Sequence, residues 1–106
     1  MSFTLATWNI NSVRLRGAIV LKLLEEEAQD VLCLQECKSP VEKIPTEGFA
    51  ALGYTHMVAR GQKGYNGVAI LSKIPMVDAG DKDFANLGHA RHVAGKRENG
   101  VTVHNF

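Results

Sequence analysis

Two short apolar segments on either side of a helical pattern constrain the fold of this chain most strongly. Residues 3–9 are rich in aromatic and β-branched side chains, and residues 31–34 form a continuous apolar run, Val-Leu-Cys-Leu. From Val13 to about Ala28, apolar residues recur at intervals of three and four, which predicts a helix. A strand–helix–strand unit places its two strands parallel with a right-handed connection, so the sequence predicts an α/β fold.

The predicted helix has one broad buried face, and Ser12 is a plausible N-cap. Its charges are placed against the helix dipole, because arginines occupy the first turn and glutamates the last. Two interpretations stay open: a solvated surface with screened charges, or arginines that attract an anion such as phosphate. The residues predicted to form the buried face are Leu15, Ala18, Ile19, Val20, Leu23 and Leu24.

Polar residues follow both predicted strands directly. Asn9 closes the first strand, and Glu36 follows the second in the stretch Gln35-Glu36-Cys37-Lys38. Because parallel strands finish at the same edge of a sheet, we expect the Asn9 amide and the Glu36 carboxylate to meet there. Open α/β sheets bind their ligands at this edge.

The middle of the chain predicts a linker at Ser39 to Pro45 and a short helix ending near Gly53. Residues 54–59 and 68–72 then indicate two strands joined by the sequence RGQKGYNG, residues 60–67. Three glycines, two basic residues and a tyrosine could bring backbone N–H groups close to a ligand, although such a segment is often only a turn. It lacks the Walker pattern.

Beyond Pro75 we expect a surface loop at Asp78 to Gly88. Residues 91–96 and 101–106 indicate two strands of a hairpin turning at residues 98–100, because Asn-Gly is a strong hairpin signal. His89 and His92 are three apart without a helix to align them, so no metal site is expected there. Neither an internal repeat nor a domain boundary is visible.

Composition excludes several classes of protein. With 106 residues, 45% hydrophobic and 22% charged, the chain resembles one globular unit or part of one, and its net charge of +1 does not by itself indicate nucleic-acid binding. No secretory signal or membrane span is visible. Cys33 and Cys37 would lie about 13 Å apart on an extended segment, too far for a disulfide, and a lone C-x3-C predicts zinc poorly. We expect Cys33 in the core and a reducing, cytoplasmic compartment.

Three motifs occur in a recognisable order: TWNINSVRLR, DVLCLQECK and GQKGYNGVAILSK. Together they resemble the N-terminal part of the exonuclease III family, in the endonuclease/exonuclease/phosphatase superfamily, and the third is similar to the apurinic-site endonuclease branch. The resemblance implies a four-layer α/β sandwich of two packed sheets flanked by helices. It also implies a monomeric phosphodiesterase, dependent on Mg²⁺ or Mn²⁺, that cuts duplex DNA 5′ to abasic sites and trims 3′ ends.

The same resemblance implies roles for particular residues. Glu36 would be a carboxylate ligand of the metal, with Asn9 as its hydrogen-bonding partner and Asn11 close by. The alternative for Asn9 and Glu36 is a structural hydrogen bond. Residues expected to face DNA are Arg14, Lys38, Gly64 and Tyr65, of which Tyr65 could equally pack within the hairpin.

The chain lacks three motifs that the family carries later in its sequence. The family's later Tyr-x-Pro-x-Gly, Gly-Asp-x-Asn and Ser-Asp-His segments do not occur. Residues 1–106 are therefore expected to be the N-terminal portion of a single domain, inactive alone, with the inner face of its sheet uncovered and the strand ending at Phe106 unpaired. Alternatives are a phosphatase or phosphodiesterase acting on another phosphate ester, and a non-catalytic nucleic-acid-binding remnant.

Overall fold

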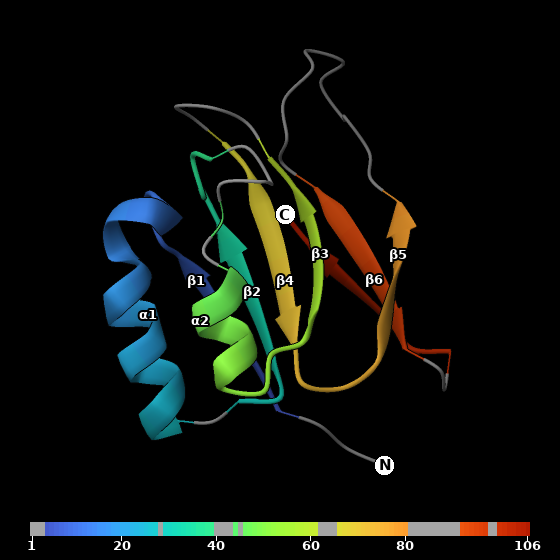
Figure 1. The fold of residues 1–106 in the computed structure, drawn as a ribbon. Coiled ribbons are helices and arrows are strands. Elements are labelled where there is room, and N and C mark those ends of the chain that lie inside the picture. Colours follow the sequence, from blue (N-terminus) through green and yellow to red (C-terminus); the bar gives the residue numbers. More distant parts are fainter. Residues whose placement is uncertain are drawn as a thin grey trace.

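In the residues that it describes, the computed structural model contains two β-sheets and two helices (Figure 1). It describes residues 4–27, 29–39, 44, 46–61, 66–80, 92–97 and 100–106. In chain order the elements are β1 (Leu5–Asn9), α1 (Val13–Glu27), β2 (Val31–Gln35), α2 (Thr46–Ala51), β3 (His56–Arg60), β4 (Val68–Ser72), β5 (Met76–Gly80), β6 (Val93–Arg97) and β7 (Thr102–Asn105). Within these residues, neither helix combines the length and the apolar character needed to cross a bilayer.

The strand–helix–strand prediction at the start of the chain is confirmed. β1 and β2 are parallel neighbours, with Asn9 opposite Gln35 at their carboxyl ends, and α1 connects them. β4 and β3 then extend the sheet by antiparallel pairing, which gives the order β1-β2-β4-β3. The fold is therefore mixed α/β.

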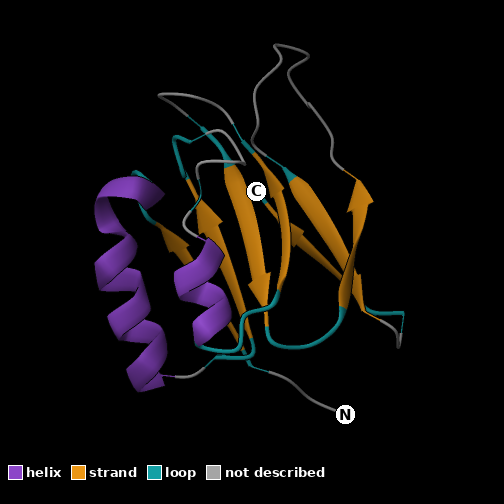
Figure 2. Ribbon diagram, viewed as in Figure 1, coloured by secondary structure: helices purple, strands orange, loops and turns teal. Residues whose placement is uncertain are grey.

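A second sheet covers the inner face of β2, β3 and β4. Both helices lie on one face of the four-stranded sheet, and the three-stranded sheet β5-β6-β7 lies on the other (Figure 2). The interface between the sheets is a cluster of apolar side chains from both: Val31, Cys33, Val58, Val68, Ile70, Met76, Val93 and Val103. The expectation of an uncovered inner face is wrong for β2, β3 and β4, because the chain after Pro75 returns as a sheet of its own. On the same face of β1, Leu5, Thr7 and Asn9 are exposed.

The buried face of α1 matches the predicted one at Val20 and Leu24 and differs from it at Ala18 and Ile19. Val13, Val20 and Leu24 are buried against the sheet, whereas Ala18 is exposed and Ile19 is 55% exposed. The side chains of Leu15 and Leu23 lie outside the described residues. A helix packed against a sheet buries only the residues on the side that faces the sheet. Fewer of its apolar residues are therefore buried than the sequence pattern predicts.

The loop predicted from Asp78 is wrong over its first residues. Asp78 to Gly80 belong to β5, which pairs with β6, and residues 81–91 lie outside the described part of the chain. The pairing shifts between Asp78 and Gly80, where Gly80 has a φ of 101°. A strand that carries a bulge at a glycine resembles a turn in sequence, which explains the error.

The predicted hairpin at the end of the chain is confirmed in its two strands. β6 and β7 are antiparallel neighbours. At the turn, the Arg97 N–H donates to the Val101 carbonyl at 2.9 Å and the Gly100 N–H to the Arg97 carbonyl at 3.0 Å. Gly100 has a φ of 90°, which glycine adopts without steric cost.

Candidate active site

The two polar residues predicted to meet at the sheet edge are in contact. Asn9 is the last residue of β1 and Glu36 follows the last residue of β2. The Asn9 side-chain amide donates a hydrogen bond to a Glu36 carboxylate oxygen. Asn9 is exposed and Glu36 half-buried, so the pair is accessible to a ligand. The predicted meeting of amide and carboxylate is confirmed, while their chemical roles stay predictions.

Main-chain hydrogen bonds join the two segments that carry this pair. Each connects the segment leaving β1 with the segment leaving β2, so the positions of Asn9 and Glu36 are set by backbone pairing beyond the ends of the strands. The donors and acceptors are Ile10 N–H to Gln35 C=O at 3.0 Å, Ser12 N–H to Glu36 C=O at 2.8 Å and Val13 N–H to Cys37 C=O at 2.9 Å.

Left-handed backbone conformations gather at the same edge. Every non-glycine residue with positive φ in the described part of the chain lies in a segment leaving β1 or β2 or entering β4: Asn11 (50°), Ser12 (93°), Glu36 (52°), Lys38 (54°) and Asn66 (54°). Such conformations cost free energy and persist only where the surroundings impose them, and they concentrate at functional sites. Their clustering here supports a functional interpretation of this edge.

Lys38 and Asn11 form a second polar contact beside the first. The Lys38 ammonium donates to the Asn11 side-chain oxygen, and the Lys38 N–H donates to the Asn66 carbonyl at 2.7 Å. Gly67 packs closely here, since a Cβ on it would lie 3.3 Å from the Lys38 nitrogen. The segment entering β4 therefore holds the backbone of Lys38 in place.

Only part of the predicted DNA-facing set can be located. Lys38 is half-buried at the edge described above. Gly64, Tyr65 and the side chain of Arg14 lie outside the described residues. The Ser12 carbonyl accepts the first hydrogen bond of α1 from the Arg16 N–H at 3.2 Å, so Ser12 occupies the N-cap position directly before Val13, as predicted.

The donors at this edge fit a hard cation, although they supply only part of a coordination sphere. Glu36 provides a carboxylate and Asn9 an amide, and oxygen donors are what Mg²⁺ and Mn²⁺ prefer. No cluster of three or more histidine, cysteine, aspartate or glutamate side chains suited to a metal occurs in the described ranges. The Asn11 oxygen accepts from Lys38, and its predicted role near the metal stays a prediction.

A polar network that the sequence did not indicate lies beneath the site. The Gln35 side-chain amide donates to the Thr7 hydroxyl at 2.8 Å and to the Asn105 side-chain oxygen at 2.7 Å. Asn105, on β7 in the other sheet, is only 2% exposed. Gln35 and Asn105 are 70 residues apart, so no local pattern could have connected them.

The cysteines and histidines within the described residues form no comparable site. Burial raises the pKa of Cys33 to about 11 and that of Cys37 to about 12, so both remain thiols near neutral pH and are poor nucleophiles and metal ligands. His92 Nε2 lies 3.1 Å from His104 Nδ1. The two nitrogens are hydrogen-bonded to each other rather than directed at a common ion.

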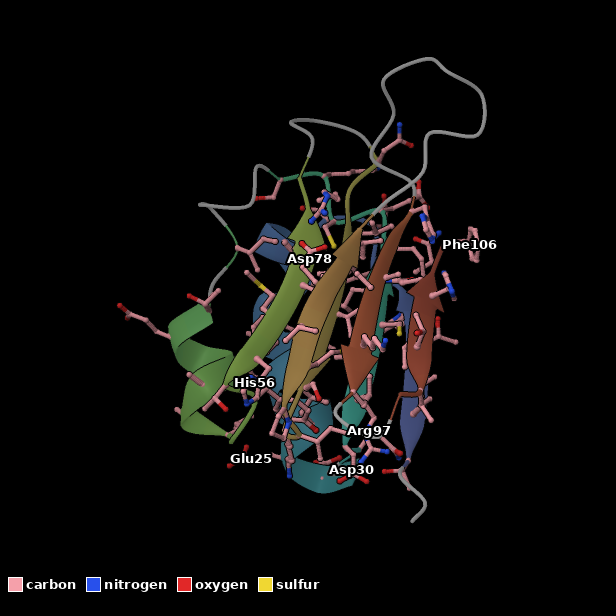
Figure 3. The ribbon with its side chains drawn as sticks, turned by 90° about the vertical axis from the view of Figure 1, so that its right-hand side faces the viewer. Glu25, Asp30, His56, Asp78, Arg97 and Phe106 are labelled. Atoms are coloured by element: carbon pink, nitrogen blue, oxygen red, sulfur yellow. The ribbon has the colours of Figure 1, made fainter. Side chains whose placement is uncertain are left out.

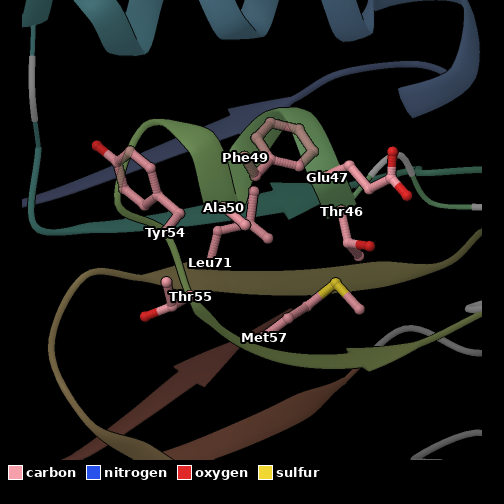
Figure 4. Close-up of a pocket in the computed structure, with 8 residues that line it drawn as sticks. All are labelled: Thr46, Glu47, Phe49, Ala50, Tyr54, Thr55, Met57 and Leu71. Carbon is pink, nitrogen blue, oxygen red and sulfur yellow. The ribbon is translucent and has the colours of Figure 1, made fainter.

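A groove on the helical face is separate from the sheet edge that carries Asn9, Glu36 and Lys38, which we call the polar edge. It encloses about 330 Å³ between α2 and the strands β3 and β4 (Figure 4). Its lining is mostly apolar and holds none of the predicted site residues: Thr46, Glu47, Phe49, Ala50, Tyr54, Thr55, Met57 and Leu71. The polar edge therefore remains the candidate active site.

Comparison with known families gives a match over nearly the whole chain. The profile described as the Endonuclease/Exonuclease/phosphatase family matches residues 6–106. A curated relative, exodeoxyribonuclease III of Haemophilus influenzae, is 42% identical over 67 residues, which are 63% of this chain and 25% of the relative. Recombination repair protein 1 of Drosophila melanogaster is 32% identical over 89 residues, which are 79% of this chain and 13% of that protein.

Solved structures share the fold. An AP endonuclease from Archaeoglobus fulgidus is 36% identical with a TM-score of 0.86, and the match covers 99% of this chain and 41% of that one. The 3′ phosphatase NExo from Neisseria, solved with a product DNA hairpin, is 34% identical with a TM-score of 0.81, covering 97% and 40%. The chain thus spans about two-fifths of the length of these solved relatives.

Proposed function

Because this chain belongs to the endonuclease/exonuclease/phosphatase family, we propose that it forms part of a divalent-metal-dependent phosphodiesterase acting on DNA. The observation that carries the proposal is the Asn9–Glu36 pair, which lies at the carboxyl edge of parallel strands in a chain matched by the family from residue 6 to residue 106. The reaction proposed is cleavage of duplex DNA 5′ to abasic sites and trimming of 3′ ends.

In this proposal Glu36 holds Mg²⁺ or Mn²⁺ through its carboxylate, and Asn9 orients that carboxylate through its amide. The cation, when bound, neutralises the charge that builds up on the scissile phosphate. Lys38 holds a neighbouring DNA phosphate by charge, which fixes position without reading sequence. Arg14, Gly64 and Tyr65 are proposed to face the same DNA.

The proposal extends to the architecture. Helices, a four-stranded sheet and a three-stranded sheet are three layers of the four-layer sandwich inferred for the whole domain. Similarity to an AP endonuclease over two-fifths of its length supports assigning residues 1–106 to the N-terminal portion of such a domain. The remaining catalytic groups would come from outside these residues.

The test is cleavage by the protein expressed from its natural gene, with all sequence encoded in the same reading frame. The substrate is a duplex with one abasic site, with Mg²⁺ present. Glu36→Gln keeps the shape of the side chain and removes its charge, so we expect cleavage to fall about a hundredfold or more while DNA binding without metal is retained. Glu47→Gln, an exposed carboxylate on α2, is the matched control.

Turnover by Glu36→Gln within twofold of the wild type at equal Mg²⁺ would contradict the assignment. A second substrate, a duplex ending in a 3′ phosphate, tests the phosphatase alternative, which the similarity to NExo favours. Removal of the 3′ phosphate without cleavage at the abasic site would select that alternative. Metal-independent DNA binding without either reaction would indicate a non-catalytic binding protein.

A further inference from the structure

Asn105 holds the end of β2 from the opposite sheet. Its side-chain NH₂ donates to the Leu34 carbonyl at 2.9 Å and to the Ala69 carbonyl at 2.8 Å. Leu34 and Ala69 are paired across β2 and β4, so one amide bridges two neighbouring strands. The Asn105 oxygen accepts from the Gln35 side chain at 2.7 Å. The last two residues of β2 are therefore both bonded to one residue of β7.

The hydrogen-bond partners allow only one orientation of the side-chain amides of Asn105 and Gln35. Carbonyl oxygens accept and never donate, so Asn105 must present its nitrogen to Leu34 and Ala69. Its oxygen then faces Gln35, which must donate through its own nitrogen. That nitrogen also donates to the Thr7 hydroxyl on β1. Only asparagine supplies two donors and one acceptor at this reach, so aspartate and leucine would each break the network.

The network acts on the residues next to the predicted metal ligand. Gln35 immediately precedes Glu36, and Thr7 lies two residues before Asn9 on the same face of β1. Glu36 leaves the strand with a φ of 52°, so its carboxylate direction depends on where the strand end is held. Asn105 fixes both the backbone and the side chain at that point.

We propose that Asn105 is a positioning residue for Glu36, acting through Leu34 and Gln35 at the end of β2. The proposal rests on the proposed function, because it assumes that Glu36 binds the metal. Residues that orient a ligand without touching the ion are commonly worth tenfold to a hundredfold in metal affinity. Asn105 is therefore a link between the second sheet and the chemistry at the edge of the first.

The test measures Mn²⁺ binding without DNA, by electron paramagnetic resonance of the free ion, in the protein expressed from its natural gene. We expect Asn105→Leu to raise the half-saturating Mn²⁺ concentration about tenfold or more. The Mg²⁺ needed for half-maximal cleavage should rise in parallel, while the KM for DNA stays unchanged. If Asn105→Leu does not fold, Asn105→Ala, which removes the donors without adding a charge, gives the same test.

The control is Val103→Ala, two residues earlier on the same strand and buried between the sheets without a polar contact to β2. It should lower the thermal midpoint and leave Mn²⁺ binding unchanged. If Asn105→Leu binds Mn²⁺ as the wild type does while Glu36→Gln does not, the inference is overturned and the proposed function stands. If Glu36→Gln also binds normally, the metal assignment itself fails.

A double variant distinguishes positioning of Glu36 through one shared route from two independent effects on Mn²⁺ binding. Gln35→Leu alone should also weaken Mn²⁺ binding, because it removes one of the two contacts through which Asn105 acts. If both residues act by one route, Gln35→Leu combined with Asn105→Leu should be no weaker than the worse single variant. Fully multiplicative losses would show that the two residues act independently, which would contradict the proposed route.

Discussion

Lys38, the residue proposed to contact a DNA phosphate, is already held in place by its neighbours. Its backbone has a φ of 54°, its N–H is bonded to Asn66 and its ammonium is bonded to Asn11. A lysine side chain normally loses considerable rotamer freedom when it binds. Because Asn11 and Asn66 already restrict Lys38, part of this rotamer entropy is lost before a phosphate binds, which favours Lys38 as a phosphate contact.

Neutralising Lys38 should therefore change the salt dependence of DNA binding. For Lys38→Met we expect the slope of log affinity against log salt concentration to flatten by about one, with equal weakening on unrelated sequences. The measurement is a salt titration by fluorescence anisotropy. Lys73→Met is the matched control, because Lys73 is exposed just beyond the other end of β4. An unchanged slope for Lys38→Met would contradict the proposed phosphate contact.

An ion pair joins one strand of each sheet near the end of the molecule that carries Asn9 and Glu36. Arg60 at the end of β3 donates two hydrogen bonds to Asp78 of β5, at 2.7 Å and 3.0 Å. Asp78 also accepts from the Gly80 N–H at 2.8 Å. Figure 3 shows Asp78 and Phe106 toward one end of the sheets and Asp30, which precedes β2, toward the other. The pair thus fastens the sheets on the side of the candidate site.

This pair predicts a pH-dependent contribution to stability. The hydrogen bonds from Arg60, together with the one from Gly80, lower the pKa of Asp78 below its ordinary value. The stabilisation is therefore present above the unfolded-state pKa near 4 and is lost as pH falls through the folded-state value. Asp78→Asn should lower the free energy of unfolding by about 0.2–1 kcal/mol at pH 7, because exposed pairs contribute little.

Urea unfolding at pH 7 and at about pH 3 checks this expectation. The difference between Asp78→Asn and the wild type should shrink at the lower pH. In an Arg60→Met background, Asp78→Asn should lose most of its effect at pH 7. A difference that is equal at both pH values would show that Arg60 is not its source.

The whole molecule has an apolar core on each face of its four-stranded sheet. One cluster lies under the helices and includes Phe49, Ile10 and Leu34, and the other lies between the sheets and includes Ile70 and Val93. All five residues of β4 are buried, as expected for a strand covered on both faces. Within the described residues, the inner sheet face that was expected to be uncovered is covered over β2, β3 and β4.

Residues 1–106 purified alone should therefore unfold cooperatively but cleave no DNA. The two apolar clusters favour a single transition in urea, while Asn9 and Glu36 alone offer too few oxygen ligands to hold a catalytic cation. The measurements are a urea transition by circular dichroism and an abasic-site cleavage assay with Mg²⁺, with Glu36→Ala as the control. Cleavage above that control would show that these residues hold a complete catalytic site.

The sequence alone determined the features that depend on local pattern and strand direction. The helix at Val13–Glu27 follows from apolar spacing, and the hairpin β6–β7 from its Asn-Gly turn. The Asn9–Glu36 contact was predictable although the residues are 27 apart, because parallel strands joined by a helix must end at one edge. For the described residues, the predicted core of the site is thus a consequence of topology.

Only the tertiary structure decided the features that depend on contacts between distant segments. Ile19 is outside and Val20 inside because the sheet meets α1 on one narrow stripe. The cover on the inner sheet face and the bond of Asn105 to Leu34, 71 residues away, arise only when the second sheet docks. The local sequence around a polar residue in a short strand is the same whether its side chain faces water or a carbonyl of another sheet. Only the packing of the two sheets distinguishes these environments.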